Sequence, residues 1–149
     1  MGDASMGEYE EYQSAEKQAM ERTLELLAKG LSRESKEELD YAGIATYLHN
    51  LYSGVENILK HILKRCGIRT AQSEAWHKEL LMAAVNHGIV SEALAGQLRN
   101  YLRFRHFFIH GYGFMLEPEL LIPLAEKAKI VFSQFFEEIE PYISKPRKE

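Results

Sequence analysis

The residues best suited to chemistry lie close together in segment 99–114, whose sequence is Arg-Asn-Tyr-Leu-Arg-Phe-Arg-His-Phe-Phe-Ile-His-Gly-Tyr-Gly-Phe. Three Arg and two His alternate there with aromatic residues. Arg presents a planar fork of donors that binds a phosphate and stabilises charge on its oxygens. His exchanges protons near neutral pH because its unperturbed pKa is about 6.5. Together these groups suit cleavage of an RNA phosphodiester by the substrate's own 2′-hydroxyl, a reaction that needs no metal.

Helical geometry divides these groups between two faces. At about 100° per residue, Arg105 falls in the same narrow arc as Leu102 and Ile109. Arg105 therefore lies in an apolar stripe, where a buried guanidinium costs several kcal/mol unless it is paired or lines a cavity. A neighbouring arc carries four cationic or titratable side chains: Arg99, Arg103, His106 and His110.

Two readings of this cluster stay open on the residues alone. In the structural reading, Arg105 pairs with a buried Glu such as Glu56, and the His residues are ordinary core or surface groups. In the functional reading, the cluster binds a phosphodiester and moves protons. Four polar residues upstream can approach such a site or serve as buried pairing groups: Tyr52, Ser53, Glu56 and Asn57.

The elements that must position the cluster are predicted to be helices. Apolar residues recur at steps of three and four along the whole chain, and few segments alternate with period two. We expect helices around residues 20–31 and 41–66, from an N-cap at Ser73 to near Gly88, from Ser91 to His110, and from Pro118 to Tyr142. Short connections then predict an all-α, up-and-down antiparallel bundle of about five helices.

Length and composition favour a single folded domain over residues 1–149. The chain is 46% hydrophobic and 27% charged with only 4 Pro, which excludes a disordered tail or a fibre. We expect an acidic N-terminal helical region, 1–40, and a core bundle, 41–143. Cys66 is the only cysteine, so no intramolecular disulfide or thiolate metal cluster is expected. No apolar run approaches the ~20 residues of a membrane span, so we expect a soluble cytoplasmic protein without a membrane partner.

The net charge of −4 is unevenly distributed along the chain. Residues 1–40 carry 11 acids and 5 bases, residues 41–116 carry 4 and 8, and residues 117–149 carry 7 and 5. A basic middle between acidic ends leaves room for a local phosphate-binding surface. The acidic ends can also serve solubility alone.

Metal and cofactor motifs are weak in this sequence. His106 and His110 are four residues apart and could chelate zinc, but no intervening Glu completes a His-Glu-x-x-His motif. The Gly111-x-Gly113 pair is too short to cradle a nucleotide. We therefore expect no metal and no cofactor.

The spacing Arg105-x4-His110-x-Tyr112 resembles the Arg-x4-His-x-Tyr motif of the HepT-like toxins in the HEPN superfamily. His106 directly follows the motif Arg, a position where members of that superfamily usually have Asn, Asp or His. The resemblance extends to Tyr-Leu-His-Asn-Leu-Tyr-Ser-Gly-Val-Glu-Asn-Ile-Leu at 47–59 and to Trp76-His77 with Leu80-Leu81. It covers residues ~40–140.

This resemblance implies a homodimeric HEPN-like bundle that acts as a metal-independent endoribonuclease, with two copies of the motif facing each other across the dimer cleft. RNA is the implied substrate, and tRNA is one candidate. Arg105 is assigned to phosphate and transition-state binding, His110 to general acid and base catalysis, and His106 to their support. Arg99 and Arg103 are assigned to electrostatic steering of RNA.

One difficulty is geometric, because Arg105 and His110 lie about 140° apart on an ideal helix. Their convergence requires a long Arg side chain, a distorted last turn at Gly111, or a contribution from the second subunit.

Tyr112 also has two readings. As structure, it caps the helix end and packs beside Phe108 or Phe114. The resemblance implies instead that Tyr112 accepts AMP from an MNT-type nucleotidyltransferase antitoxin, as in the type VII-like HepT/MNT toxin–antitoxin pairs. An added phosphate would cancel local positive charge and block RNA entry.

Two other functions remain as alternatives. A HEPN-like bundle can be a non-catalytic substrate-binding or scaffold subunit of a two-component nucleotidyltransferase. It can also be a helical interaction module, in which the Arg and His cluster is a plain dimer contact.

Overall fold

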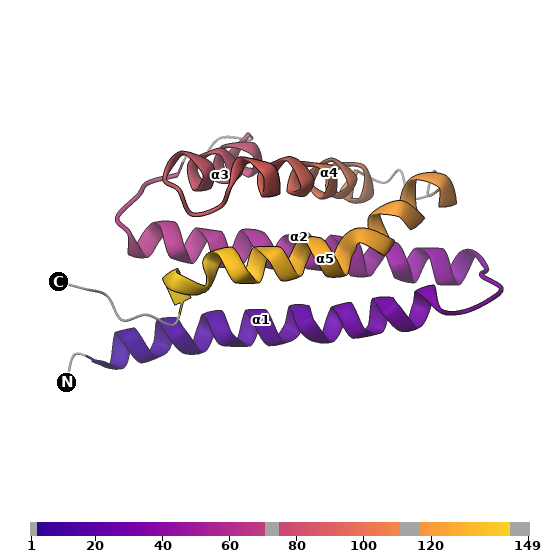
Figure 1. The fold of residues 1–149 in the computed structure, drawn as a ribbon, viewed down its shortest axis with the longest axis horizontal. Helices are drawn as coiled ribbons and strands as arrows, with labels where there is room; N and C mark the ends of the chain where they lie inside the picture. Colours follow the sequence, from indigo (N-terminus) through magenta and orange to yellow (C-terminus); the bar gives the residue numbers. More distant parts are fainter. Residues whose placement is uncertain (1–2, 71–74, 111–116, 144–149) are drawn as a thin grey trace.

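The computed structural model describes residues 3–70, 75–110 and 117–143, with side chains from residue 7 onward. The described residues form five helices and no strand (Figure 1). The helices are α1 (Asp3–Leu31), α2 (Glu38–Arg65), α3 (Trp76–Asn86), α4 (Glu92–Ile109) and α5 (Pro118–Ile143). The predicted all-α fold with about five helices is confirmed.

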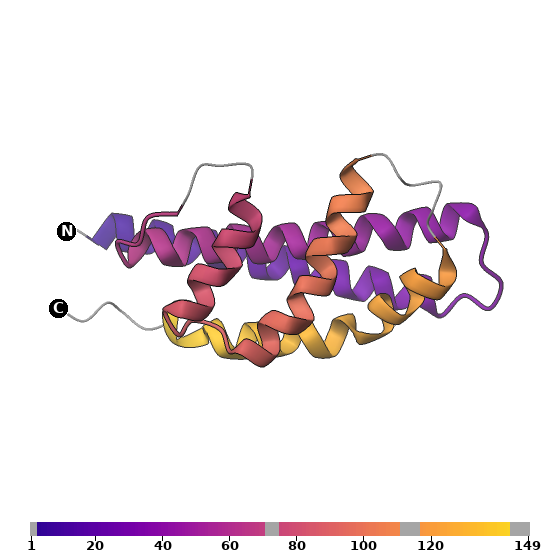
Figure 2. The ribbon, with the colours of Figure 1, turned by 90° about the horizontal axis from the view of Figure 1, so that it is seen from above.

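The helices form three layers. α1 lies along one side of α2 and α5, while α3 and α4 lie on the other side (Figure 1). Seen from above, α3 and α4 run side by side across the long axis that α1, α2 and α5 follow (Figure 2). The start of α3 and the end of α4 therefore lie along the same edge of the molecule.

Helix boundaries follow the local signals in the sequence. Ser91 caps α4, its Oγ accepting the N–H of Leu94 at 3.1 Å, as predicted. α2 ends before Gly67, which takes the left-handed φ of 78° expected of a helix-terminating glycine. Ala75, rather than the predicted Ser73, occupies the N-cap position of α3. Ser73 itself lies outside the described residues.

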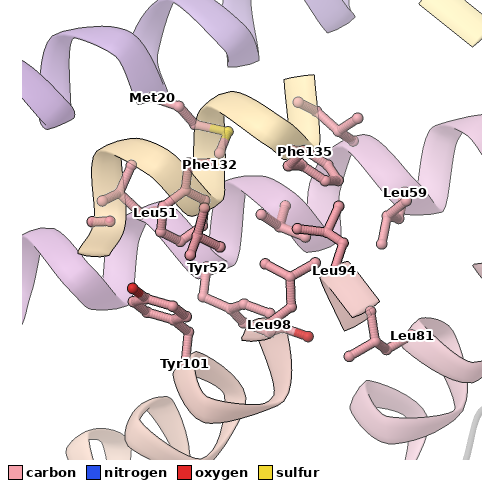
Figure 3. Close-up of a cluster of buried hydrophobic side chains, with 14 of the residues drawn as sticks. Met20, Leu51, Tyr52, Leu59, Leu81, Leu94, Leu98, Tyr101, Phe132 and Phe135 are labelled. Atoms are coloured by element: carbon pink, nitrogen blue, oxygen red, sulfur yellow. The ribbon is translucent and has the colours of Figure 1, made fainter. Parts of the chain in front are cut away.

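All five helices contribute to one hydrophobic core (Figure 3). Its largest buried side chains are Tyr52 of α2, Tyr101 of α4, and Phe132 and Phe135 of α5. Met20 of α1 and Leu81 of α3 belong to the same buried cluster. Burial of this apolar area from every helix is the main stabilising contribution to the fold.

α1 starts much earlier than its apolar stripe from Met20 predicts. Its first half is held by polar and aromatic contacts, which a search for apolar periodicity does not detect. The buried amide of Gln13 donates to the carbonyl of Ile58 at 3.2 Å, and the Tyr9 hydroxyl donates to the carbonyl of Tyr142 at 3.0 Å. The acidic N-terminal region is thereby packed against α2 and α5.

No helix among the described residues combines the length and the apolarity needed to cross a membrane.

Candidate functional site

The candidate site lies where α3 begins and α4 ends, at one edge of the molecule (Figure 2). The first turns of α4 are fixed to α5. The backbone N–H and the hydroxyl of Ser91 donate to Glu138 at 2.7 and 2.9 Å, and the Tyr101 hydroxyl donates to the carbonyl of Leu124 at 2.7 Å. The C-terminal turns of α4, which carry the Arg and His cluster, therefore extend from a rigid base.

Burial along α4 falls steadily toward the cluster. On the apolar stripe, Leu98 is fully buried, Leu102 and Arg105 are half-buried, and Ile109 is 48% exposed. Its neighbour Phe107 is 55% exposed. The predicted apolar stripe is present, and Arg105 lies where it passes from core to surface.

Arg105 reaches a buried carboxylate through an intermediate His. The Nη1 atom of Arg105 lies 3.5 Å from Nε2 of His77, and Nδ1 of His77 lies 2.8 Å from Oε2 of Glu56. If His77 donates its Nδ1 proton to Glu56, Nε2 is an acceptor that faces the guanidinium. We name the chain Glu56–His77–Arg105 the polar relay. It joins α2, α3 and α4.

The inner end of the polar relay is electrostatically unusual. Glu56 is only 3% exposed, and burial raises the pKa of its carboxyl group. The hydrogen bond from His77 opposes this rise most strongly, followed by the charges of His77, Arg105 and Lys60. Burial also raises the pKa of the Tyr52 hydroxyl, one turn earlier on α2. The polar relay thus holds the Arg105 guanidinium near the buried Glu56 carboxyl group, whose burial is only partly offset by hydrogen bonding and nearby positive charge.

Four buried polar atoms have no hydrogen-bond partner within the part of the chain that the structure describes. Three belong to α2, α3 and α4, namely the hydroxyl of Tyr52, Oε1 of Glu79 in the first turn of α3, and Nε of Arg105; the fourth is Oε1 of Gln13 on α1. A buried donor without a partner costs about 1–3 kcal/mol, so such groups often mark a place where a ligand completes the bonding.

The two histidines of the cluster are exposed and adjacent. The ring centroids of His106 and His110 lie 4.3 Å apart, and His110 is the C-cap residue of α4. Arg103 donates to Oδ1 of Asn100 at 2.6 Å, and Arg99 is exposed on the same helix. A phosphate would therefore meet several cationic or titratable groups at this end of α4.

Within a single chain, the side chains of Arg105 and His110, the two groups assigned to catalysis, point apart. The guanidinium of Arg105 points to His77, whereas the ring of His110 lies against His106. This agrees with the separation expected on an ideal helix. Gly111 and Tyr112, the predicted distorted turn and AMP acceptor, lie outside the described residues.

The structural reading of Arg105 holds in part, because Glu56 is its buried counter-charge, with His77 interposed. The sequence did not identify His77 as the link. Two features of the sequence could have pointed to His77: its place in the Trp76-His77 pair, and the need of a half-buried Arg for a hydrogen-bond partner. The rings of Trp76 and His77 lie 3.8 Å apart. Asn57, by contrast, donates to Glu16 of α1 at 3.2 Å and so faces away from the site.

Within residues 3–70, 75–110 and 117–143, no three His, Cys, Asp or Glu side chains are arranged to hold a metal ion.

Comparison with protein families matches residues 43–145, more than two thirds of the chain, to the family described as HepT-like protein. The match includes α2 from its second turn onward, with α3, α4 and α5, and therefore the whole polar relay and the His pair. No curated protein and no solved structure matches the chain.

Proposed function

The chain belongs to the HepT-like family, and from this premise we propose that it is the toxin of a HepT/MNT toxin–antitoxin pair, a metal-independent endoribonuclease. The observation that carries the proposal is the end of α4. There, a half-buried Arg105 with an unpartnered donor lies beside two exposed histidines. A phosphate-binding fork and proton carriers are the groups that RNA cleavage by the 2′-hydroxyl requires.

In the proposed reaction, the 2′-oxygen of RNA forms a bond to the adjacent phosphorus while the bond from phosphorus to the 5′-oxygen breaks. One imidazole takes the 2′-hydroxyl proton, and an imidazolium gives a proton to the leaving 5′-oxygen. We assign His110 to proton transfer and His106 to its support. Arg105 donates to the non-bridging oxygens, where negative charge increases in the transition state.

We propose that the active form is a homodimer. Phe107 and Ile109 expose apolar surface beside the cluster, and such surface suits an isologous contact with a second copy. A facing copy would bring His110 of one subunit toward Arg105 of the other, which resolves their separation within one chain. The molar mass from light scattering tests this. A dimer is expected, and Ile109→Glu should give a monomer that no longer cleaves RNA.

The proposed partner is an MNT-type nucleotidyltransferase that transfers AMP to Tyr112. Tyr112 lies two residues after His110 in the sequence, so the added phosphate would be near the cationic cluster. Negative charge at this place opposes RNA binding. An increase of the intact mass by AMP units, abolished by Tyr112→Phe, tests this assignment.

Incubation of the purified chain with total RNA in excess EDTA tests the main proposal. Wild type is expected to cleave RNA, and His110→Ala is expected to reduce the rate by about 10²–10⁴-fold. His87→Ala is the matched control, because His87 is the exposed C-cap residue of α3. It should cleave like wild type.

The intact mass of the same sample completes the experiment. An unmodified wild type that leaves RNA intact contradicts the ribonuclease proposal and favours the non-catalytic scaffold subunit. Cleavage that His110→Ala retains contradicts the assignment of His110. If the wild-type mass shows added AMP, the assay is repeated with Tyr112→Phe. Cleavage by this variant supports the ribonuclease proposal, and intact RNA contradicts it.

A further inference from the structure

A basic pocket lies beside the candidate site, at the end of α2 and in the residues that follow it. Its volume is about 500 Å³, and it is lined by Lys60, Lys64, Ile68, Arg69 and Thr70. Three of these five side chains are cationic, one offers a hydroxyl group, and none is acidic. We call this feature the basic pocket.

The cations of the basic pocket form no direct ion pair with a carboxylate in the part of the chain described here, although the charge of Lys60 also acts on the buried Glu56 carboxyl. Lys60, Lys64 and Arg69 take part in none of the ion pairs between described residues. The sequence agrees, because residues 57–73 contain four Lys or Arg and no Asp or Glu. A concave surface with uncompensated positive charge concentrates anions.

Side-chain contacts connect the basic pocket to the polar relay. Nζ of Lys60 lies 4.7 Å from the ring centroid of Trp76, a cation–π distance. The Trp76 ring contacts His77, whose Nε2 faces Arg105. The Lys60 side chain is therefore held toward α3. Contacts between neighbouring side chains therefore link the pocket, through Trp76 and His77, to the proposed phosphate site at Arg105.

We infer that the basic pocket is a second phosphate subsite, which binds the backbone of the RNA strand whose scissile phosphate lies at Arg105. This rests on the proposed ribonuclease function. Single-stranded RNA carries one phosphate per nucleotide, so one strand supplies both sites with an anion. The pocket volume is in the range of small-ligand sites and admits a nucleotide. An acidic protein would satisfy the same charges, but continuity with the Arg105 site favours the RNA strand.

The only tryptophan of the chain, Trp76, provides a direct probe. We would titrate the full chain with a single-stranded 2′-O-methyl RNA oligonucleotide, which lacks the nucleophilic hydroxyl and is not cleaved, and follow Trp76 fluorescence. The test variant is Lys64→Gln/Arg69→Gln, which changes two exposed residues of the pocket. The control is Lys29→Gln/Lys127→Gln, which removes the same charge from exposed positions on α1 and α5.

Oligonucleotide binding is expected to change the emission of wild type. The pocket variant should raise Kd about tenfold at ~150 mM salt and lower the salt slope by about 1.4, since each lost contact to single-stranded nucleic acid removes about 0.7. The control should bind within about twofold of wild type, because its charges lie away from the strand. Circular dichroism melting of both variants should match wild type, because all four positions are exposed.

Three results would overturn the inference. If wild type cleaves RNA through His110 but the pocket variant and the control have equal Kd, the pocket is not a subsite and the ribonuclease function stands. If the pocket variant binds RNA normally but no longer binds the nucleotidyltransferase, the pocket contacts a protein partner. If wild type neither binds the oligonucleotide nor cleaves RNA, both proposals fail.

Discussion

The two outer layers of this bundle differ in how many of their polar side chains are left available at the surface. On the α1 side, polar groups connect helices to one another: Gln13 reaches the backbone of α2, Asn57 reaches Glu16, and the Tyr12 ring stacks on His61 at 3.9 Å. On the α3 and α4 side, the polar relay also joins helices, but the histidines at the end of α4 lie at the surface. His106 and His110 contact each other, and Nε of Arg105 has no partner among the described residues.

This difference separates stability from chemistry within one small protein. The hydrogen bonds on the α1 side lower the cost of burying polar groups and hold those groups away from a ligand, although Oε1 of Gln13 has no partner among the described residues. The opposite edge keeps donors and proton carriers available, and they extend from helix turns that are anchored to α5. The family match, which begins at residue 43, agrees with this division because it omits α1 and contains the whole edge.

The largest expected effect is on catalysis at the edge. Arg105→Lys keeps the positive charge but removes the planar fork that binds two phosphate oxygens. We expect kcat/KM for RNA cleavage to fall at least about 100-fold, with little change in melting temperature. The control is Arg22→Lys on the exposed face of α1, which should change neither quantity. Cleavage by Arg105→Lys at the wild-type rate would remove Arg105 from the transition state.

On the α1 side, we expect a substitution to lower stability and to leave catalysis unchanged. Met20 is 2% exposed in the core, so Met20→Ala should lower the free energy of unfolding by about 2–5 kcal/mol. The folded variant should still cleave RNA well below its melting temperature. Urea unfolding measures the loss, and Gln18→Ala at an exposed position of α1 is the control. A loss below about 1 kcal/mol would mean that α1 is not part of the cooperative core.

A smaller effect tests how closely α1 and α2 approach. A Cβ atom added at Gly54 would lie 2.6 Å from Cγ of Met20, whereas one added at Gly43 meets nothing within 4 Å. Gly54→Ala should therefore destabilise the fold by about 1–3 kcal/mol through overpacking. Gly43→Ala on the same helix should stabilise it by about 0.5–1 kcal/mol, because alanine is the better helix former. Equal melting temperatures for the two variants would contradict the close approach.

The smallest expected effect is a pH dependence from the polar relay. Because the pKa of Glu56 is raised above its ordinary value of 4.5, the folded chain binds this proton more tightly than the unfolded chain. The free energy of unfolding should therefore fall as pH rises from 4.5 through the raised pKa. Glu56→Gln should remove this fall, because it keeps an oxygen that accepts from His77 but carries no charge.

Melting temperatures across this pH range measure the effect of Glu56→Gln. Glu126→Gln, an exposed residue of α5, controls for the change in net charge. Parallel curves for wild type and Glu56→Gln would show that Glu56 is not the group responsible.

The sequence by itself determined most of the fold. Apolar residues at steps of three and four, Ser91 as a cap and Gly67 as a stop predict the helices, because these signals act within a few residues of each other. The sequence also placed the Arg and His cluster at the end of one helix, since order along a helix follows directly from spacing. Within the expected helical region 1–40, the apolar stripe located only the second half of α1, because its first half packs through polar and aromatic contacts.

Only the tertiary structure decided which residues meet. Glu56, His77 and Arg105 come from three helices, and 21 and 28 residues separate the contacting pairs. No local pattern specifies such contacts, because they depend on how α3 and α4 cross α2. The same crossing directs Arg105 inward while His110 remains outside, and it brings Trp76 beneath Lys60. Spacing within a helix orders residues along its axis, but packing between helices selects the partner of each buried charge.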